Sequence, residues 1–202
     1  MTMTSVKGRH GGRLLEVVLG VALVLAGLFG VFLPLLGVTG PIDPMDTHDV
    51  RIDAVTRVPA AVTSGPVTLH GTHQAEIALA HPDVQQRILL ALPDVFYGAL
   101  LIVVLAFLLR MARTLREADV FVPENARRLQ VIAAAIVAMG VLGPAVDAIA
   151  THLLISGTAV SPAVPFAYTV SAAPLFLGLL VAALAEVFRQ GTRLREDTEG
   201  LV

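Results

Sequence analysis

Four of the six histidines in this chain lie between residues 37 and 92, where six carboxylates accompany them. Neutral imidazole and carboxylate are the usual ligands of Zn²⁺ in proteins, so this segment is a candidate metal site. The spacing of His70 and His73 does not fix the geometry, because nothing places the two rings on one face of a helix. Solvated loop histidines are the more common outcome of such a pattern, and a pH-sensing role is a third interpretation. The candidate metal ligands are His48, His70, His73 and His81.

Two carboxylates lie at the edges of long apolar stretches: Asp147, which follows a Gly-Pro pair, and Glu186. Acidic residues at membrane depth are rare, and each is a functional candidate by default. Glu186 follows small residues at intervals of four, so we expect its side chain to face a helix bundle rather than lipid. Proton passage would need a second polar group midway across the membrane, and no apolar stretch contains one. The alternative is a structural ion pair with Arg189 or with an arginine between residues 110 and 128.

The composition indicates which elements must position these residues. Of 202 residues, 55% are apolar and only 15% are charged, whereas soluble domains carry about 25% charged residues. The apolar residues fall in four long blocks, the first of which runs from Leu14 to Leu36. Its 23 residues form a helix of about 34 Å, enough to cross a hydrocarbon core of about 30 Å. The sequence therefore predicts a mainly α-helical polytopic membrane protein and disfavours a soluble enzyme.

Local signals set the expected ends of the helices. Pro93 suits the first turn of the second helix, and Pro123 suits the first position of the third. Gly191 is expected to cap the fourth helix or to loosen its final turn. The Gly143-Pro144 pair is expected to bend the third helix. The predicted regions are a cytoplasmic tail (1–13), the first span (14–36), an extracytoplasmic β-rich loop domain (37–92), the second span (93–115), a cytoplasmic loop (116–128), the third span (129–155), an extracytoplasmic loop (156–169), the fourth span (170–190) and a cytoplasmic tail (191–202).

The placement of basic residues predicts the orientation. Eleven of the 14 lysines and arginines precede the first span, lie between residues 110 and 128, or follow the fourth span. The other three all lie between residues 37 and 92. Because cytoplasmic segments carry the excess of Lys and Arg, we expect a multi-pass protein of the bacterial cytoplasmic membrane with both termini in the cytoplasm.

Residues 37–92 are too many for a plain connection, and they show the alternation of β-strands. Apolar and polar residues alternate at 50–54, at 67–69 and at 74–79, and Gly71 lies where a turn between the last two would fall. The sequence thus predicts a small antiparallel sheet. So few strands are not stable alone, so the sheet must pack on the helix ends or on a second copy.

Two motifs on the expected cytoplasmic side carry a resemblance to a known family. The first motif consists of Phe121, Pro123, Glu124, Asn125, Arg127, Arg128 and Leu129, and the second of Glu186, Phe188, Gly191, Leu194, Arg195 and Glu196. In both motifs the chain resembles an uncharacterised bacterial family of small four-helix membrane proteins, the domain of unknown function number 2975. The resemblance covers most of residues 90–202. The chain departs from the family at Val122, where a hydroxyl N-cap is common, and in its last residues.

The resemblance implies a partner, because members of this family are frequently encoded beside a small helix-turn-helix regulator of the Cro/CI type. It suggests a membrane-bound sensor or sequestering partner of such a regulator. The arginines also have a simpler interpretation, which is that they enforce topology and contact anionic lipid head groups. The expected partner-binding residues are Arg113, Arg116, Phe121, Pro123, Glu124, Asn125, Arg127, Arg128, Phe188, Gly191, Leu194, Arg195 and Glu196.

Other classes of protein stay open. The small-residue helix faces also suit a structural or accessory subunit of a membrane complex, or a homo-oligomer. A small transporter is disfavoured, because it would need polar groups at the membrane midplane. We expect neither enzymatic activity nor a cofactor, since no nucleophile–base pair can be assembled on one side of the membrane. Direct binding of nucleic acid is not expected either, because the basic residues are spread over three short segments beside lipid.

Overall fold

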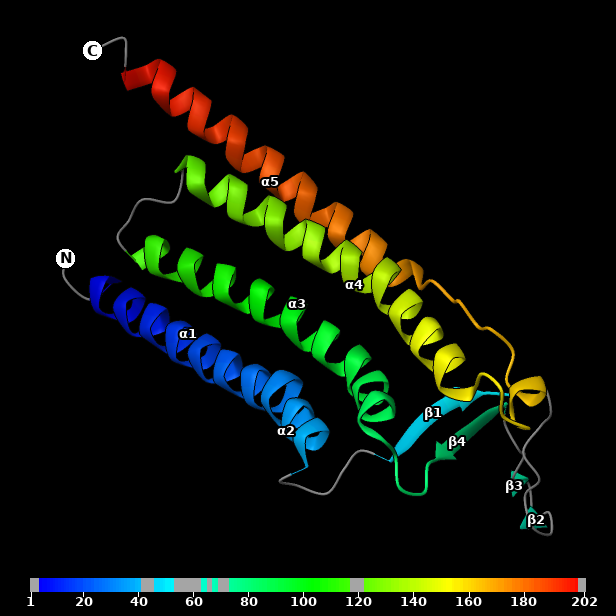
Figure 1. Ribbon diagram of the computed structural model, residues 1–202. Coiled ribbons are helices and arrows are strands. Elements are labelled where there is room, and N and C mark those ends of the chain that lie inside the picture. Colours follow the sequence, from blue (N-terminus) through cyan, green and yellow to red (C-terminus); the bar gives the residue numbers. More distant parts are fainter. Residues whose placement is uncertain are drawn as a thin grey trace. The chain divides into compact units, whose positions relative to one another are not determined.

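A computed structural model describes residues 4–40, 46–52, 63–64, 67–68, 73–116 and 122–199, with side chains for 12–40, 46–52, 73–114 and 122–194. The described chain is mainly helical (Figure 1). It divides into two compact units. The helical unit contains Met1–Leu33, Asp94–Pro144 and Val170–Val202, and the sheet unit contains Pro34–Pro93 and Ala145–Thr169.

The helices confirm the predicted apolar spans. The first stretch consists of α1 (Thr4–Gly27), a π-helical turn (Leu28–Phe32) and α2 (Leu33–Thr39). It is followed by α3 (Val84–Arg116), α4 (Pro123–Ile155), a short 3₁₀ turn (Ser161–Ala163) and α5 (Ala172–Glu199). Within the described residues, four helical stretches are long and apolar enough to cross a membrane, namely Gly12–Thr39, Val84–Thr114, Pro123–Ile155 and Ala172–Leu194.

The second helix begins earlier than its sequence suggested. α3 starts at Val84, and Pro93 lies inside it, so the predicted start at Pro93 is wrong. The backbone N–H of Gln86 donates to the carboxylate of Asp83 at 2.7 Å, and the backbone N–H of Asp83 donates to the side-chain oxygen of Gln86 at 2.9 Å. This reciprocal capping box satisfies N–H groups of the first turn and starts the helix at Val84.

The fourth helix continues past its predicted end. α5 runs through Gly191 to Glu199, so the expected cap at Gly191 is wrong. A glycine inside a helix costs only about 1 kcal/mol, and the residues that follow it favour helix. The hydroxyl of Thr192 donates to the carbonyl of Phe188 at 3.0 Å, across this position. α4 likewise continues through Gly143 and Pro144, and it begins at Pro123 as expected.

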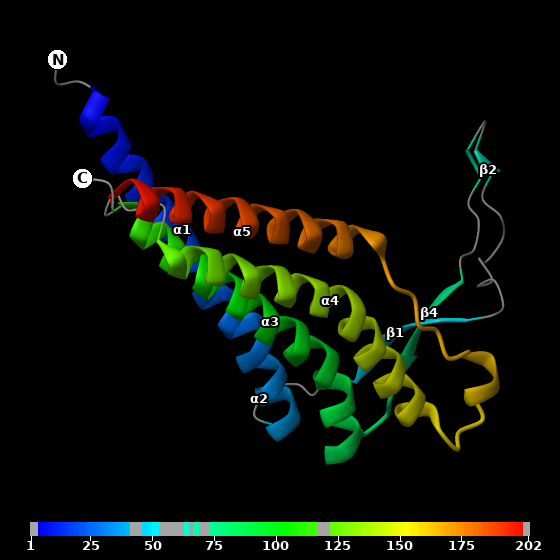
Figure 2. The ribbon, with the colours of Figure 1, turned by 90° about the horizontal axis from the view of Figure 1, so that it is seen from above.

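The core of the helical unit forms where α3, α4 and α5 meet. Its buried residues are Met111, Leu129, Ile132 and Ala185. α4 and α5 lie side by side in antiparallel directions (Figures 1 and 2). Glycines permit this approach, because a Cβ added to Gly178 would lie 2.5 Å from a methyl carbon of Val137. Small residues let membrane helices pack closely in this way.

Close packing also joins the π-helical turn after α1 to α3. A Cβ added to Gly30 would lie 2.8 Å from the Cα of Gly98, and one added to Gly98 would meet the carbonyl of Gly30. Gly30 lies within the π-helical turn, whose last hydrogen bond runs from the N–H of Leu33 to the carbonyl of Leu28. The two backbones therefore cross with no side chain between them.

The sheet unit pairs its strands differently from the prediction. β1 (Thr47–Arg51) pairs antiparallel with β4 (Gln74–Ala78), so that Val50 lies opposite Ala75. β2 (Thr63–Ser64) pairs with β3 (Val67–Thr68). The expected hairpin between the segments at 67–69 and 74–79 is therefore wrong for the described strands, and Gly71 itself lies outside the described residues.

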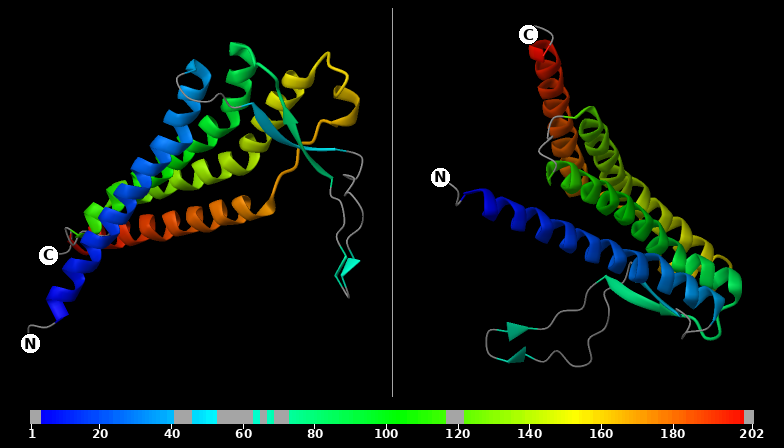
Figure 3. Two further views of the ribbon diagram at one scale, coloured as in Figure 1. Left: turned by 90° about the horizontal axis from the view of Figure 1, so that it is seen from below. Right: turned by 90° about the vertical axis from the view of Figure 1, so that its left-hand side faces the viewer.

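The β1–β4 sheet packs on the end of a helix, as predicted. Val50 is buried together with Ile155, the last residue of α4, and with Val164. Ile52, Ala75 and Ile77 pack against this cluster. Figure 3 shows β1 and β4 running side by side. The helix end supplies the apolar contact that two short strands lack on their own.

Candidate functional site

The first family motif contains a fully buried polar residue. Asn125 is 0% exposed, and its amide oxygen accepts a hydrogen bond from Arg128 at 3.0 Å. The hydroxyl of Thr114, on α3, lies 3.1 Å from the same oxygen and 2.8 Å from the carbonyl of Met111. Buried polar groups are stable only when they are hydrogen-bonded, and these partners meet that requirement.

Thr114, Asn125 and Arg128 together form a contact that we call the α3–α4 clasp. Arg128 extends it, because its Nη1 lies 3.4 Å from the backbone carbonyl of Arg110 and 3.5 Å from the Thr114 hydroxyl. The clasp holds the end of α3 against the start of α4 within the helical unit. The Asn and the second Arg of the motif therefore position helices and are not free for a partner.

Other residues of the first motif are exposed. Pro123, Glu124 and Arg127 lie on the surface of the first turns of α4, whereas Leu129 is buried in the core. Arg113 is also exposed, near the end of α3. The motif thus combines buried residues that fix the helix ends with exposed charges.

A hollow of about 320 Å³ lies between the start of α4 and the later turns of α5. Three arginines line this arginine hollow, namely Arg127, Arg189 and Arg193. Its full lining is Pro123, Ala126, Arg127, Gln130, Arg189, Thr192 and Arg193. Such a site can bind an anion, because arginine pairs well with carboxylate and phosphate.

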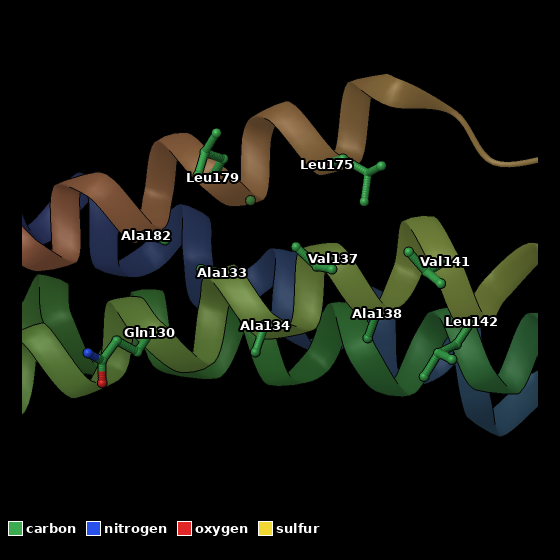
Figure 4. Close-up of a pocket in the computed structure, with 11 residues that line it drawn as sticks. Gln130, Ala133, Ala134, Val137, Ala138, Val141, Leu142, Leu175, Leu179 and Ala182 are labelled. Carbon is green, nitrogen blue, oxygen red and sulfur yellow. The ribbon is translucent and has the colours of Figure 1, made fainter.

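An apolar groove of about 710 Å³ lies next to the hollow, between the same two helices (Figure 4). Its walls include Val137 and Val141 from α4 and Leu175 and Leu179 from α5, and small residues form much of the rest. The full lining is Gln130, Ala133, Ala134, Val137, Ala138, Val141, Leu142, Leu175, Gly178, Leu179 and Ala182. Gln130 borders both the groove and the hollow.

Glu186 makes the ion pair that the sequence suggested, but it does not face the bundle. Its Oε2 lies 2.7 Å from a guanidinium nitrogen of Arg189, and the side-chain amide of Gln190 donates to its other carboxylate oxygen, Oε1, at 3.2 Å. Its side chain is 42% exposed, whereas Ala185 beside it is 1% exposed. Intervals of four residues turn about 40° further around a helix at each step, so Glu186 has left the face that begins at Gly178.

Two residues that the sequence assigned to different sites lie together in the sheet unit. The Nε2 of His48, a predicted metal ligand on β1, is 3.3 Å from a carboxylate oxygen of Asp147 on α4. The same nitrogen is 2.9 Å from the hydroxyl of Thr151. No sequence signal joins residues so far apart along the chain. His48 therefore attaches β1 to α4.

The described histidines do not assemble a metal site. No group of three His, Asp or Glu side chains in the described part of the chain is placed to hold a metal ion. His73 lies 3.2 Å from the carbonyl of Ile52, and His81 is exposed on a backbone with φ of 60°. His70 lies outside the described residues.

The second family motif also divides between core and surface. Phe188 packs against the core of the helical unit, and Gly191 is half-buried. Leu194 is 67% exposed. Phe121 lies outside the described residues, as do the side chains of Arg116, Arg195 and Glu196.

Comparison with known sequences and structures identifies a family. The pattern described as "Protein of unknown function (DUF2975)" matches residues 54–202, which include both motifs, the α3–α4 clasp and the arginine hollow. No match was found among the curated proteins or among the solved structures. Because the match spans well over half of the chain, this protein belongs to the DUF2975 family.

Proposed function

We propose that this protein is a non-enzymatic, multi-pass protein of the cytoplasmic membrane that binds a cytoplasmic helix-turn-helix regulator through the end of α5. The observation that carries the proposal is the length of this helix. α5 has 28 residues, or about 42 Å, which exceeds the hydrocarbon core of about 30 Å by some 12 Å. About eight residues, 192–199, therefore extend into water as a helix.

The extended end of α5 has the features of a docking helix. Leu194 is 67% exposed there, beyond Thr192, and charged residues flank it. An exposed apolar side chain on a preformed helix is the element that helix-in-groove recognition uses. The regulator as partner rests on the family resemblance and on the charge of this segment.

The proposed orientation has both termini in the cytoplasm. Eleven of the 14 basic residues lie in the segments that this orientation makes cytoplasmic. The start of α1, the end of α3, the start of α4 and the end of α5 lie at one end of the helical unit (Figure 1). The β1–β4 sheet is then extracytoplasmic, where its attachment through His48 and Asp147 would serve the sensing role.

Co-purification tests the proposal. The full chain is tagged, expressed in its native cell, cross-linked and purified in detergent, beside the variants Leu194→Asp and Leu194→Met. The native chain and Leu194→Met should recover a helix-turn-helix regulator, because methionine keeps the apolar surface. Leu194→Asp should recover at most about a tenth of the amount that the native chain recovers, because a carboxylate disfavours apolar docking.

Two results would contradict the proposal. One is the absence of the regulator from all three samples, and the other is its equal recovery with Leu194→Asp. Recovery of other membrane subunits, unaffected by either change, would instead favour an accessory subunit that associates through its exposed apolar helix faces, such as that of Phe176 and Leu180.

A further inference from the structure

The arginine hollow and the apolar groove adjoin at Gln130 and lie along the same two helices. On α4 the lining residues recur at intervals of three and four from Pro123 to Leu142, which is a single stripe along the helix. On α5 the lining runs in the same way from Leu175 to Ala182 and resumes at Arg189. Gln130 belongs to both. A ligand that fills both must therefore be elongated, with one charged end and one apolar end.

The dimensions of the groove match half of a bilayer. From Gln130 to Leu142 the groove follows α4 for twelve residues, or about 18 Å. One leaflet contributes about 15 Å to a hydrocarbon core of about 30 Å. An acyl chain that lies in the groove would thus span its leaflet, and its head group would reach the arginine hollow.

The charge of the hollow selects an acidic head group. Three arginines border it, and Glu186 is the one carboxylate in ion-pair contact with them among the described side chains. That contact occupies Arg189, so among the described side chains the hollow keeps an excess of positive charge from Arg127 and Arg193. Basic pockets between membrane helices bind anionic lipid head groups, and each arginine contributes about 1 kcal/mol.

From these observations we infer that the surface between α4 and α5 is a binding site for one acidic phospholipid, with its phosphate in the arginine hollow and an acyl chain in the groove. The apolar lining excludes a purely polar anion as the full occupant, because such an anion leaves the groove empty. The arginines exclude a neutral lipid as the preferred occupant. This site is independent of the regulator and of the exposed Leu194.

Native mass spectrometry of the full chain in detergent tests the site. The protein is titrated with dioleoylphosphatidylglycerol, with dioleoylphosphatidylcholine and with inorganic phosphate. We expect one phosphatidylglycerol to remain bound at a detergent-to-lipid ratio at which phosphatidylcholine dissociates. Each of Arg127→Gln and Arg193→Gln should weaken the preference about fivefold, and the double variant roughly thirtyfold.

Two further variants separate the head-group site from the groove. Ala138→Phe places a large side chain in the groove and leaves every arginine in place, so it should displace phosphatidylglycerol. Arg113→Gln removes an exposed arginine that does not line the hollow, and it should leave the preference unchanged.

Several outcomes would overturn the inference. Equal retention of phosphatidylglycerol and phosphatidylcholine would show that the site does not select lipids by charge. An equal loss of phosphatidylglycerol binding with Arg113→Gln and with the hollow variants would show that the hollow is not the head-group site. Binding of inorganic phosphate as strong as that of phosphatidylglycerol, unaffected by Ala138→Phe, would show that the groove takes no part. A mass of two chains that Ala138→Phe reduces to one would assign the groove to a second copy.

Discussion

The amide oxygen of Asn125 lies 3.1 Å from the hydroxyl of Thr114, and this contact joins the start of α4 to the end of α3. Two turns of helix that are separated in sequence thereby share one buried acceptor. The guanidinium of Arg128 donates to the same oxygen at 3.0 Å. Asn125 and Arg128 of the first family motif thus fix the positions of the two helix ends. The fixed start of α4 in turn holds Arg127 at the edge of the arginine hollow.

Replacing Asn125 by alanine should destabilise the protein by about 1–3 kcal/mol, because the change removes the acceptor that Thr114 and Arg128 share and leaves a gap at a fully buried position. The free energy of unfolding in detergent, measured with a chemical denaturant, checks this. Glu124→Ala is the matched control, since Glu124 is the exposed neighbour in the same turn. Equal stability of the two variants would show that the clasp contributes nothing.

Substitution of the neighbouring arginines Arg127 and Arg128 should affect the melting temperature to different extents. Arg128→Gln shortens a side chain that reaches Asn125 and the carbonyl of Arg110, so it should lower the melting temperature. Arg127→Gln should leave the melting temperature within a degree or two of the native value, because surface substitutions cost little. A thermal scan in detergent compares them, and the reverse order would contradict the assignment.

Gly98→Ala should weaken the packing of the π-helical turn, and with it the first helical stretch, on α3. The new methyl group would meet the backbone carbonyl of Gly30, and overpacking of this kind costs about 1–3 kcal/mol. Gly20→Ala is the control, because a Cβ there meets nothing within 4 Å, so it should be neutral or stabilising. Cysteine cross-linking between α1 and α3 in each background measures the contact. Unchanged cross-linking in Gly98→Ala would argue against the crossing.

His48→Leu should release β1 from α4 by removing the contacts with Thr151 and Asp147. Faster amide hydrogen exchange across β1 and β4 is the expected result. His48→Gln should restore most of the protection, since its amide group can donate to the same hydroxyl. His81→Asn, at an exposed site whose positive φ asparagine tolerates, should have no effect. Equal protection in all variants would remove the attachment role.

The apolar helices were predictable because their evidence is local. Four runs of apolar residues long enough to cross a bilayer leave little choice of structure, and Pro123 marked the start of α4. The start of α3 was also encoded locally, in the spacing of Asp83 and Gln86, but the later Pro93 was a more conspicuous signal. A proline does not have to end such a helix, because its surroundings can satisfy the backbone group that the proline leaves without a hydrogen bond.

The contacts between distant residues were not predictable from the sequence. The pairing of β1 with β4 rather than β3 with β4, and the approach of His48 to Asp147, depend on how the chain returns to the end of α4. The site between α4 and α5 depends on side chains from two helices whose rotation the apolar pattern does not fix, because both are apolar on most faces. The prediction for Glu186 was wrong for another reason, because residues at intervals of four drift by about 40° per step around a helix.

The π-helical turn at Leu28–Phe32 amounts to a one-residue insertion in the first membrane helix. Deleting a residue there would restore a regular helix and rotate the preceding segment by about 100° relative to the crossing with Gly98. Val21, which is now exposed, would then take the half-buried position of Ala22, and the half-buried Leu23 would take the exposed position of Val24. The length of this short stretch therefore sets which face of the first helix meets the lipid, and insertions or deletions there should be tolerated less than substitutions.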